Sequence, residues 1–158
     1  MVALGNIKKI FRDHTLSFEE YYTQAQQKCD TLHTIIENID PNDHIYTMEE
    51  ATKELGLDET LIDTLLEDYV KQIISTVPQM RSYLHKIKHP HNLDGSPLRD
   101  LAHKNLGVAR NLRIKDAQKI LQCIMKSTDI KKIQQCIEYL EACAILLKPH
   151  IAYEAYKK

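Results

Sequence analysis

The chain has 158 residues, the size of one domain with a substantial hydrophobic core. Tryptophan is absent and only 4 residues are glycine, a composition that favours helices over sheets. No apolar run approaches the roughly 20 residues needed to cross a membrane. The first residues also lack the apolar core of a secretory signal, so we expect a cytoplasmic protein without a membrane partner.

The net charge of −1 conceals an uneven distribution along the chain. Residues 1–78 contain 6 Lys and Arg against 15 Asp and Glu, whereas residues 79–158 contain 15 against 7. The basic residues are scattered and lack aromatic neighbours, which argues against a nucleic-acid partner. Two interpretations stay open: the halves attract each other within the fold, or the basic half guides an acidic protein partner.

Residues 1–45 are expected to form an N-terminal helical extension. The sequence at 17–20 matches a capping box, which predicts a helix from there to about Asn38. Apolar residues recur in it at helical spacing: Phe18, Tyr22, Ala25, Cys29, Leu32 and Ile36. This row favours packing within the chain, with pairing of two copies in a dimeric helical scaffold as an alternative. Residues 40–43 predict a turn.

Two helices are predicted next. A second capping box at 47–50 starts a short helix that ends before Gly56. Asp58 caps a long helix to about Lys88, whose wide apolar stripe is typical of a core helix. Pro78 is expected to bend or interrupt that helix.

Three more helices complete the pattern. Serine followed by proline at 96–97 predicts the start of the helix that contains residues 102–112. Residues 115–126 form the next, and Asp129 caps a last helix that stops before Pro149. Because short connections make neighbouring helices antiparallel, we expect an all-α fold. It would be an antiparallel up-down four-helix bundle over residues 46–150, with the additional N-terminal helices outside it and a C-terminal tail at 151–158.

The segment 102–112 carries the strongest functional signal, reading Ala-His-Lys-Asn-Leu-Gly-Val-Ala-Arg-Asn-Leu. A helical wheel places His103 opposite the apolar face, in solvent, with Gly107 one turn further on the same side. A glycine inside a helix costs about 1 kcal/mol relative to alanine. An exposed imidazole beside a position without a side chain suits a phosphoryl acceptor approached by another protein.

The segment resembles the histidine-containing phosphotransfer (HPt) family, whose signature is roughly Ala-His-x-Leu-Lys-Gly-Ser-Ala-x-Asn-Leu. Six positions fall in register: Ala102, His103, Gly107, Ala109, Asn111 and Leu112. The likeness in helix order extends over about residues 47–148. It implies a monomeric phosphocarrier in a two-component phosphorelay, more a substrate than an enzyme. His103 would accept a phosphoryl group from a receiver-domain aspartate and pass it to another receiver. The implied partners are response-regulator receivers and a hybrid histidine kinase, and the partner receiver would supply Mg²⁺, so that the chain needs no cofactor of its own.

Two positions depart from the family pattern. Leu106 stands where the family has a lysine, and Asn105 stands where it has a core leucine, so that an amide points toward the core. These departures support an alternative function, a non-phosphorylated HPt-like adaptor that docks a receiver or another signalling protein.

Several residues are expected to assist His103. Arg99, Lys104 and Arg110 would neutralise phosphoryl charge, or are cations of an ordinary solvated face. Gln122 on the following helix is a candidate to orient the imidazole. Leu106 either joins a hydrophobic docking patch with Val77 or Met80, or is half-buried.

No metal site is expected from the spacing of potential ligands. The four cysteines, Cys29, Cys123, Cys136 and Cys143, lack Cys-x-x-Cys spacing and lie at apolar helix positions, as reduced thiols do. A possible metal-binding group is formed by His85, His89 and His91. Because Pro90 interrupts the helix there, we interpret them as solvated loop histidines and not as metal ligands. His33 and Glu37 resemble part of a hemerythrin-like di-iron set, but residues 133–147 contain no histidine.

Overall fold

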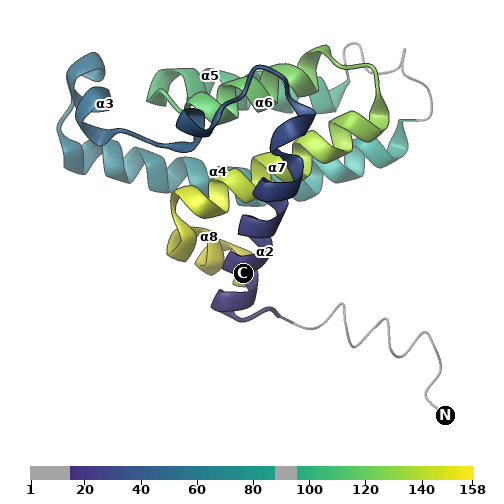
Figure 1. Ribbon diagram of the computed structural model, residues 1–158, viewed down its shortest axis with the longest axis horizontal. Helices are drawn as coiled ribbons and strands as arrows, with labels where there is room; N and C mark the ends of the chain where they lie inside the picture. Colours follow the sequence, from purple (N-terminus) through teal and green to yellow (C-terminus); the bar gives the residue numbers. More distant parts are fainter. Residues whose placement is uncertain (1–14, 88–95) are drawn as a thin grey trace.

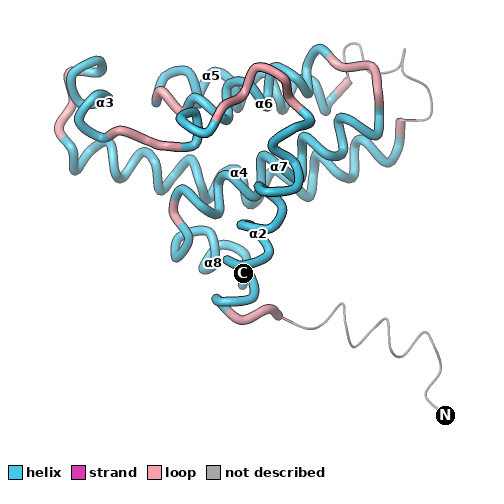
Figure 2. The backbone as a smooth tube through the Cα atoms, in the orientation of Figure 1, coloured by secondary structure: helices cyan, strands magenta, loops and turns pink. Residues whose placement is uncertain are grey.

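The computed structural model describes residues 15–87 and 96–158, and the regular structure in this part of the chain is entirely helical (Figures 1 and 2). The α-helices are α2 (Phe18–Leu32), α3 (Met48–Leu55), α4 (Glu59–Lys86), α5 (Pro97–Leu112), α6 (Lys115–Lys126), α7 (Ile130–Leu147) and α8 (Pro149–Lys157). Two short 3₁₀ turns, η1 (His33–Ile35) and η2 (Pro41–His44), follow α2. Within the same residues, no helix has both the length and the apolar character that a bilayer crossing requires.

Helices α4 to α7 pack in a cyclic order. Helix α4 contacts α5, α5 contacts α6, α6 contacts α7, and α7 contacts α4. Figure 1 shows the chain running to one end of the molecule along α4, back along α5, out along α6 and back along α7. Consecutive members of the group are therefore antiparallel, as the short connections predict.

The core lies between these four helices, because each turns an apolar stripe toward the others. Its largest fully buried side chains are Tyr139, Ile62, Leu66, Ile73, Met80, Leu98, Ile120, Leu121, Ile124, Ile133 and Ile137. Three predicted caps are present: the side chains of Asp58, Ser96 and Asp129 accept hydrogen bonds from the first turns of α4, α5 and α7. These caps fix where the core helices begin.

Residues 149–157 are helical, although 151–158 were expected to be a tail. Pro149 ends α7 but also opens α8, since proline fits the first position of a helix. Helix α8 packs on α4 and α7. The Tyr153 hydroxyl donates to the Leu16 carbonyl at 2.8 Å, and the Tyr156 hydroxyl accepts from the Leu16 amide at 3.0 Å. The two ends of the described chain are thereby joined.

Helix α2 has the capping box predicted at Ser17 and Glu20 but ends at Leu32, short of Asn38. His33 Nδ1 approaches the Asp30 carbonyl at 2.7 Å. Beyond it, β-branched residues follow one another at 34–36, and Ile36 is extended and buried. Local side-chain bonding and low helix propensity thus stop the helix early.

The capping box expected at the start of α3 is absent. The Thr47 side chain does not cap α3, and Glu50 turns instead toward Lys115, 3.9 Å away. Of the bend or interruption expected at Pro78, the interruption does not occur, because helix α4 runs through Pro78, which lies on its exposed side. Burial of the opposite face along the whole length of α4 holds that helix together despite the missing amide.

The segment from residue 33 to 47 crosses from α2 to the ends of α5 and α6, and we call it the arm. The Tyr46 hydroxyl donates to the Leu112 carbonyl at 2.7 Å. Lys119 on α6 binds the Asn38 carbonyl at 2.6 Å and the Asp43 carboxylate at 2.7 Å. A hydrogen bond to the backbone of α5 and two from a lysine of α6 thus fasten the arm.

Candidate functional site

Helix α5 presents His103 to solvent, as its wheel predicts. The buried positions of this helix are Leu98, Ala102, Asn105, Leu106, Ala109 and Leu112. They face α4 and α6, which leaves the side of His103 exposed. Ser96 caps the first turn, and Arg113 in the left-handed conformation (φ 65°) ends the helix. The imidazole therefore stands in the middle of a helix that is fixed at both ends.

Gly107 is exposed one turn beyond His103. A Cβ atom placed on it would meet no heavy atom within 4 Å, apart from its own helix turn and chain neighbours. Its backbone is helical, with no positive φ that would require glycine. Packing within the described chain thus gives no reason for a residue that weakens the helix by about 1 kcal/mol. The result is uncovered backbone beside an uncovered imidazole.

The cations expected around His103 differ in their surroundings. Lys104 and Arg110 are exposed on α5. Arg99 is half-buried, and its Nη2 atom donates to the Ser127 carbonyl at the end of α6, 3.4 Å away. Arg99 thus links α5 to α6, whereas Lys104 and Arg110 are directed into solvent.

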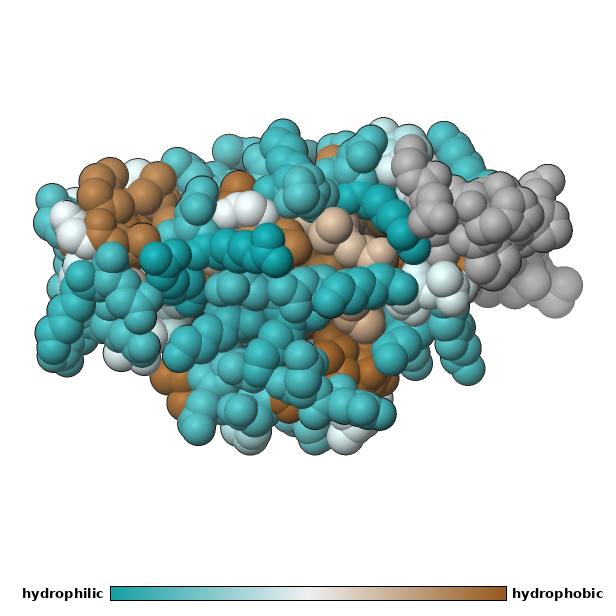
Figure 3. All heavy atoms as spheres, turned by 90° about the horizontal axis from the view of Figure 1, so that it is seen from above, coloured by the Kyte–Doolittle hydropathy of each residue, from teal (hydrophilic) through white to brown (hydrophobic). Residues whose placement is uncertain are grey.

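Figure 3 shows the upper face of the molecule, the side along which α5 and α6 lie in Figure 1. Hydrophilic side chains cover most of it, and hydrophobic residues show between them at the end where α3 lies in Figure 1 and near the middle of the view. Among the described residues, the exposed large hydrophobic ones are Ile45 and Leu61, at 63% and 43% exposure. Both precede α5 in the sequence, so they do not continue the face of His103 along its own helix.

Leu106 is buried at 3% exposure, together with Val77 and Met80, which are fully enclosed. Of the two alternatives for Leu106, the hydrophobic docking patch with Val77 or Met80 does not fit their burial, and Leu106 is more deeply buried than the other alternative expects. The reason is that α4 packs directly against α5, which places all three in the interface between the two helices.

Asn105 points into the core, as predicted, and is 1% exposed. Its Nδ2 atom donates to the Leu101 carbonyl one turn earlier at 2.8 Å. Its Oδ1 atom is buried and has no hydrogen-bond partner among the residues that the structure describes. An unsatisfied buried acceptor typically costs about 1–3 kcal/mol, so this amide weakens the fold next to His103.

The remaining predicted site residues are dispersed. Gln122 is half-buried on α6, and no hydrogen bond joins it to His103. His85 is exposed in the last turn of α4, while His89 and His91 lie outside the described residues. His33 and Glu37 are exposed on the arm, where they form no ligand group with His85.

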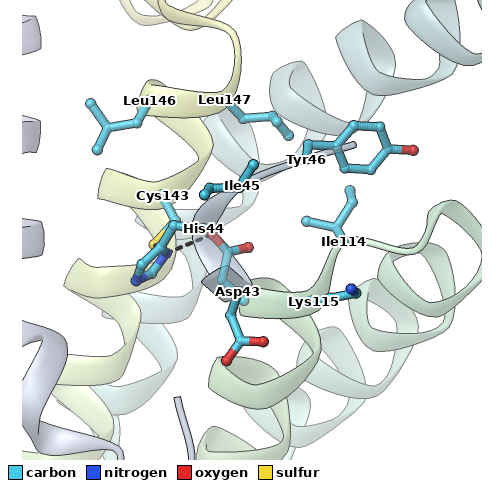
Figure 4. A pocket seen from close by; sticks show the side chains of 10 residues that line it. Asp43, His44, Ile45, Tyr46, Ile114, Lys115, Cys143, Leu146 and Leu147 are labelled. Atoms are coloured by element: carbon cyan, nitrogen blue, oxygen red, sulfur yellow. Dashed lines mark hydrogen bonds and ion pairs between the residues drawn. The ribbon is translucent and has the colours of Figure 1, made fainter. Parts of the chain in front are cut away.

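A second cluster, which spacing does not reveal, lies where the arm meets α6 and α7 (Figure 4). His44 Nδ1 is 3.0 Å from Asp116 Oδ2 and 3.7 Å from Cys143 Sγ. These three residues line a small cavity of about 70 Å³. The hydrogen bond to Asp116 raises the pKa of His44 above its ordinary value, although burial opposes the charge. Burial raises the pKa of the Cys143 thiol well above its usual range.

The four cysteines lie in two pairs and are all free thiols. Cys29 and Cys143 have their sulfur atoms 3.9 Å apart, and Cys123 and Cys136 have theirs 3.4 Å apart. The pairs join α2 to α7 and α6 to α7. Only the helix phases bring the thiols together, because the partners are 114 and 13 residues apart in sequence.

Comparison of the chain with known protein families, with curated proteins and with solved structures finds no match.

Proposed function

We propose that the protein is an HPt-like phosphocarrier of a two-component phosphorelay, with His103 as the phosphoryl acceptor. Helices α4 to α7 would form the antiparallel up-down four-helix bundle of that family, with α2, α3 and α8 packed outside. The observation that carries the proposal is the exposed imidazole at the middle of α5, one turn from uncovered Gly107. The cyclic contacts and alternating directions of α4 to α7 support the bundle.

Phosphoryl transfer requires little from the chain beyond an exposed imidazole at His103. The lone pair of His103 Nε2 attacks the phosphorus of an aspartyl phosphate on a receiver domain. A P–N bond forms, the P–O bond to the aspartate breaks, and the carboxylate leaves with the electron pair. Transfer to a second receiver reverses these steps. The receiver's Mg²⁺ and lysine stabilise the transferring group, so His103 serves as substrate and carrier.

Gly107 and the neighbouring cations fit the approach of a receiver. Without a side chain at 107, the partner's backbone comes close to the imidazole. Lys104 and Arg110 place positive charge on the exposed side of α5, which favours encounter with the acidic pocket of a receiver. Arg99 is half-buried and donates to the Ser127 carbonyl at the end of α6, so it adds positive charge from beneath the exposed surface of α5.

A second function, the non-phosphorylated adaptor, is favoured by Leu106. The position of the family lysine is filled by a side chain that the core encloses, so no cation occupies it. An adaptor would use the same face of α5 to bind a receiver and would not need the nucleophile. The two functions differ in whether loss of the imidazole abolishes function.

The deciding experiment uses phosphoramidate, which phosphorylates accessible histidines without a protein donor. The expected result is an acid-labile phosphate on His103, located by peptide mass spectrometry and absent from His103→Gln. His85→Gln is the matched control, an exposed helical histidine whose loss should leave the adduct in place. Transfer from a phosphorylated receiver is then measured with both variants.

Two outcomes would overturn the phosphocarrier. One is a folded protein that accepts no phosphate from phosphoramidate or from several phosphorylated receivers. The other is receiver binding that survives His103→Ala with no phosphoryl transfer in the native chain, which would establish the adaptor.

A further inference from the structure

The cluster at the end of the arm brings together three kinds of metal-ligating atom. His44 offers a ring nitrogen from η2, Asp116 a carboxylate oxygen from the first turn of α6, and Cys143 a thiol from α7. Their ligand atoms all lie within 4.8 Å of one another. Figure 4 shows His44 and Cys143 side by side at the cavity, from η2 and α7, and Asp116 Oδ2 lies 3.0 Å from His44 Nδ1.

The distances match the edges of a tetrahedral zinc site. Zn–S bonds of about 2.3 Å and Zn–N or Zn–O bonds of about 2.0–2.1 Å place sulfur and nitrogen ligands about 3.6 Å apart, and nitrogen and oxygen ligands about 3.3 Å apart. The Cys143 Sγ to His44 Nδ1 distance is 3.7 Å, and the Nδ1 to Asp116 Oδ2 distance is 3.0 Å. The three atoms therefore need only small shifts to share one cation.

The other ring nitrogen of His44 is held as it is in metal sites. His44 Nε2 is 2.7 Å from the hydroxyl of Tyr139, which is fully buried on α7. A ligating histidine usually donates its second N–H to such an acceptor, which fixes the ring and directs the free nitrogen at the metal. Tyr139 thus positions the imidazole so that Nδ1 faces Asp116 and Cys143.

Cys29 is the nearest further donor. Its sulfur lies 3.9 Å from that of Cys143, close to the roughly 3.8 Å that separates two thiolates on one zinc ion. It lies outside the group of three atoms within 4.8 Å of one another, so it must move toward His44 and Asp116 to complete the set. Four protein ligands would make the site closed, as structural zinc sites are.

We propose that His44, Asp116 and Cys143, completed by Cys29, form a structural Zn²⁺ site. The mixed sulfur, nitrogen and oxygen donors suit zinc better than calcium or magnesium, which prefer oxygen alone. The cation takes the place of the proton shared by Nδ1 and Oδ2, and the thiols release their protons on binding. The site joins α2, the arm, α6 and α7, so zinc fastens the N-terminal extension to the core helices. This role is independent of phosphoryl transfer at His103.

The test uses the full chain, stripped of metal and kept reduced with a phosphine. Zn²⁺ affinity is measured by competition with a chromophoric chelator, and Co²⁺ is added as a spectroscopic probe. We expect one ion per chain, a tetrahedral Co²⁺ spectrum with thiolate charge-transfer absorption, and a higher Tm with Zn²⁺. Cys143→Ser and His44→Gln should each weaken binding more than about 100-fold, and Tyr139→Phe about 10- to 100-fold. Cys29→Ser should also weaken binding and reduce the thiolate absorption.

The matched controls are Cys123→Ser, a thiol of the other pair, and His33→Gln, an exposed histidine of the arm. Both should bind Zn²⁺ like the native chain. Far-ultraviolet circular dichroism checks folding, and His44→Gln keeps the test valid if Cys143→Ser misfolds, because His44 lies outside the core helices. The proposal is overturned if Co²⁺ shows no thiolate absorption, or if the controls lose as much affinity as the ligand variants. If Cys29→Ser binds Zn²⁺ as tightly as the native chain, Cys29 is not a ligand, and the proposal of a closed four-ligand site is overturned.

Discussion

The Nε atom of Arg81 on α4 donates a 2.7 Å hydrogen bond to Oε1 of Glu138 on α7. The same guanidinium reaches Glu141 with Nη2 at 2.8 Å, and Lys28 of α2 binds the second oxygen of Glu138 at 2.9 Å. A single carboxylate thus joins two core helices and the N-terminal extension. Burial alone would raise the pKa of Glu138, but the bonds from Arg81 and Lys28 hold it below its ordinary value of 4.5.

The lowered pKa of Glu138 predicts a pH-dependent contribution to stability. Because the folded state binds the proton less tightly than the unfolded chain, the contribution is complete above about pH 5 and is lost as the pH falls below 4.5. Glu138→Gln should lower the free energy of unfolding at pH 7 by up to about 1 kcal/mol, since both side chains are partly solvated. Urea unfolding across this pH range measures the difference.

The matched control is Glu154→Gln, which removes a more exposed pair with Lys157 one helical turn away. It should change stability by less than about 0.5 kcal/mol at any pH. A difference between native protein and Glu138→Gln that stays constant down to acid pH would contradict the prediction.

Substitutions at Gly107 should leave the fold intact, and a large side chain there should slow phosphoryl transfer. Gly107→Ala is expected to raise the free energy of unfolding by about 1 kcal/mol, because an added Cβ meets no neighbour. Gly107→Gln should also fold, yet slow phosphoryl transfer from a receiver by about tenfold or more, which corresponds to about 1.4 kcal/mol. Its reaction with phosphoramidate should be unchanged, because that donor is small. Equal transfer rates in all three proteins would show that no partner approaches this position.

Asn105→Leu is expected to stabilise the protein. The change removes the buried Oδ1 atom that has no partner, and leucine fills the same side of α5. We expect a gain of about 1 kcal/mol or more in the free energy of unfolding, from thermal or urea denaturation. Asn111→Leu, the same change at an exposed position of α5, should gain less than about 0.5 kcal/mol. Destabilisation by Asn105→Leu would mean that the amide is needed for packing.

Cys123 is expected to be more reactive than Cys136, the other thiol of its pair. A hydrogen bond from the Cys136 thiol lowers the pKa of Cys123, and burial, which opposes it, is incomplete at this half-buried residue. Alkylation by iodoacetamide near neutral pH should therefore modify Cys123 before buried Cys136. In Cys136→Ala the reaction of Cys123 should slow several-fold, as peptide mass spectrometry would record. An unchanged rate would rule out this hydrogen bond as the cause.

The helical class, most helix limits and the exposure of His103 follow from local sequence signals. Capping residues such as Asp58, Ser96 and Asp129 act on backbone amides two or three residues away, so their effect is local. The exposure of His103 follows from the period of a single helix. Where local signals compete, as at His33 and Pro149, the same reasoning misplaced the end of α2 and missed α8.

Only the tertiary structure decided which side chains meet. Leu106 lies at the border of its helix face, and its burial depends on how closely α4 approaches α5. Cys29, His44, Asp116 and Cys143 come together from positions up to 114 residues apart, with no spacing that identifies them. Their convergence depends on the phases of α2, α6 and α7 and on the path of the arm. Packing of the whole core sets these together, and no single segment encodes them.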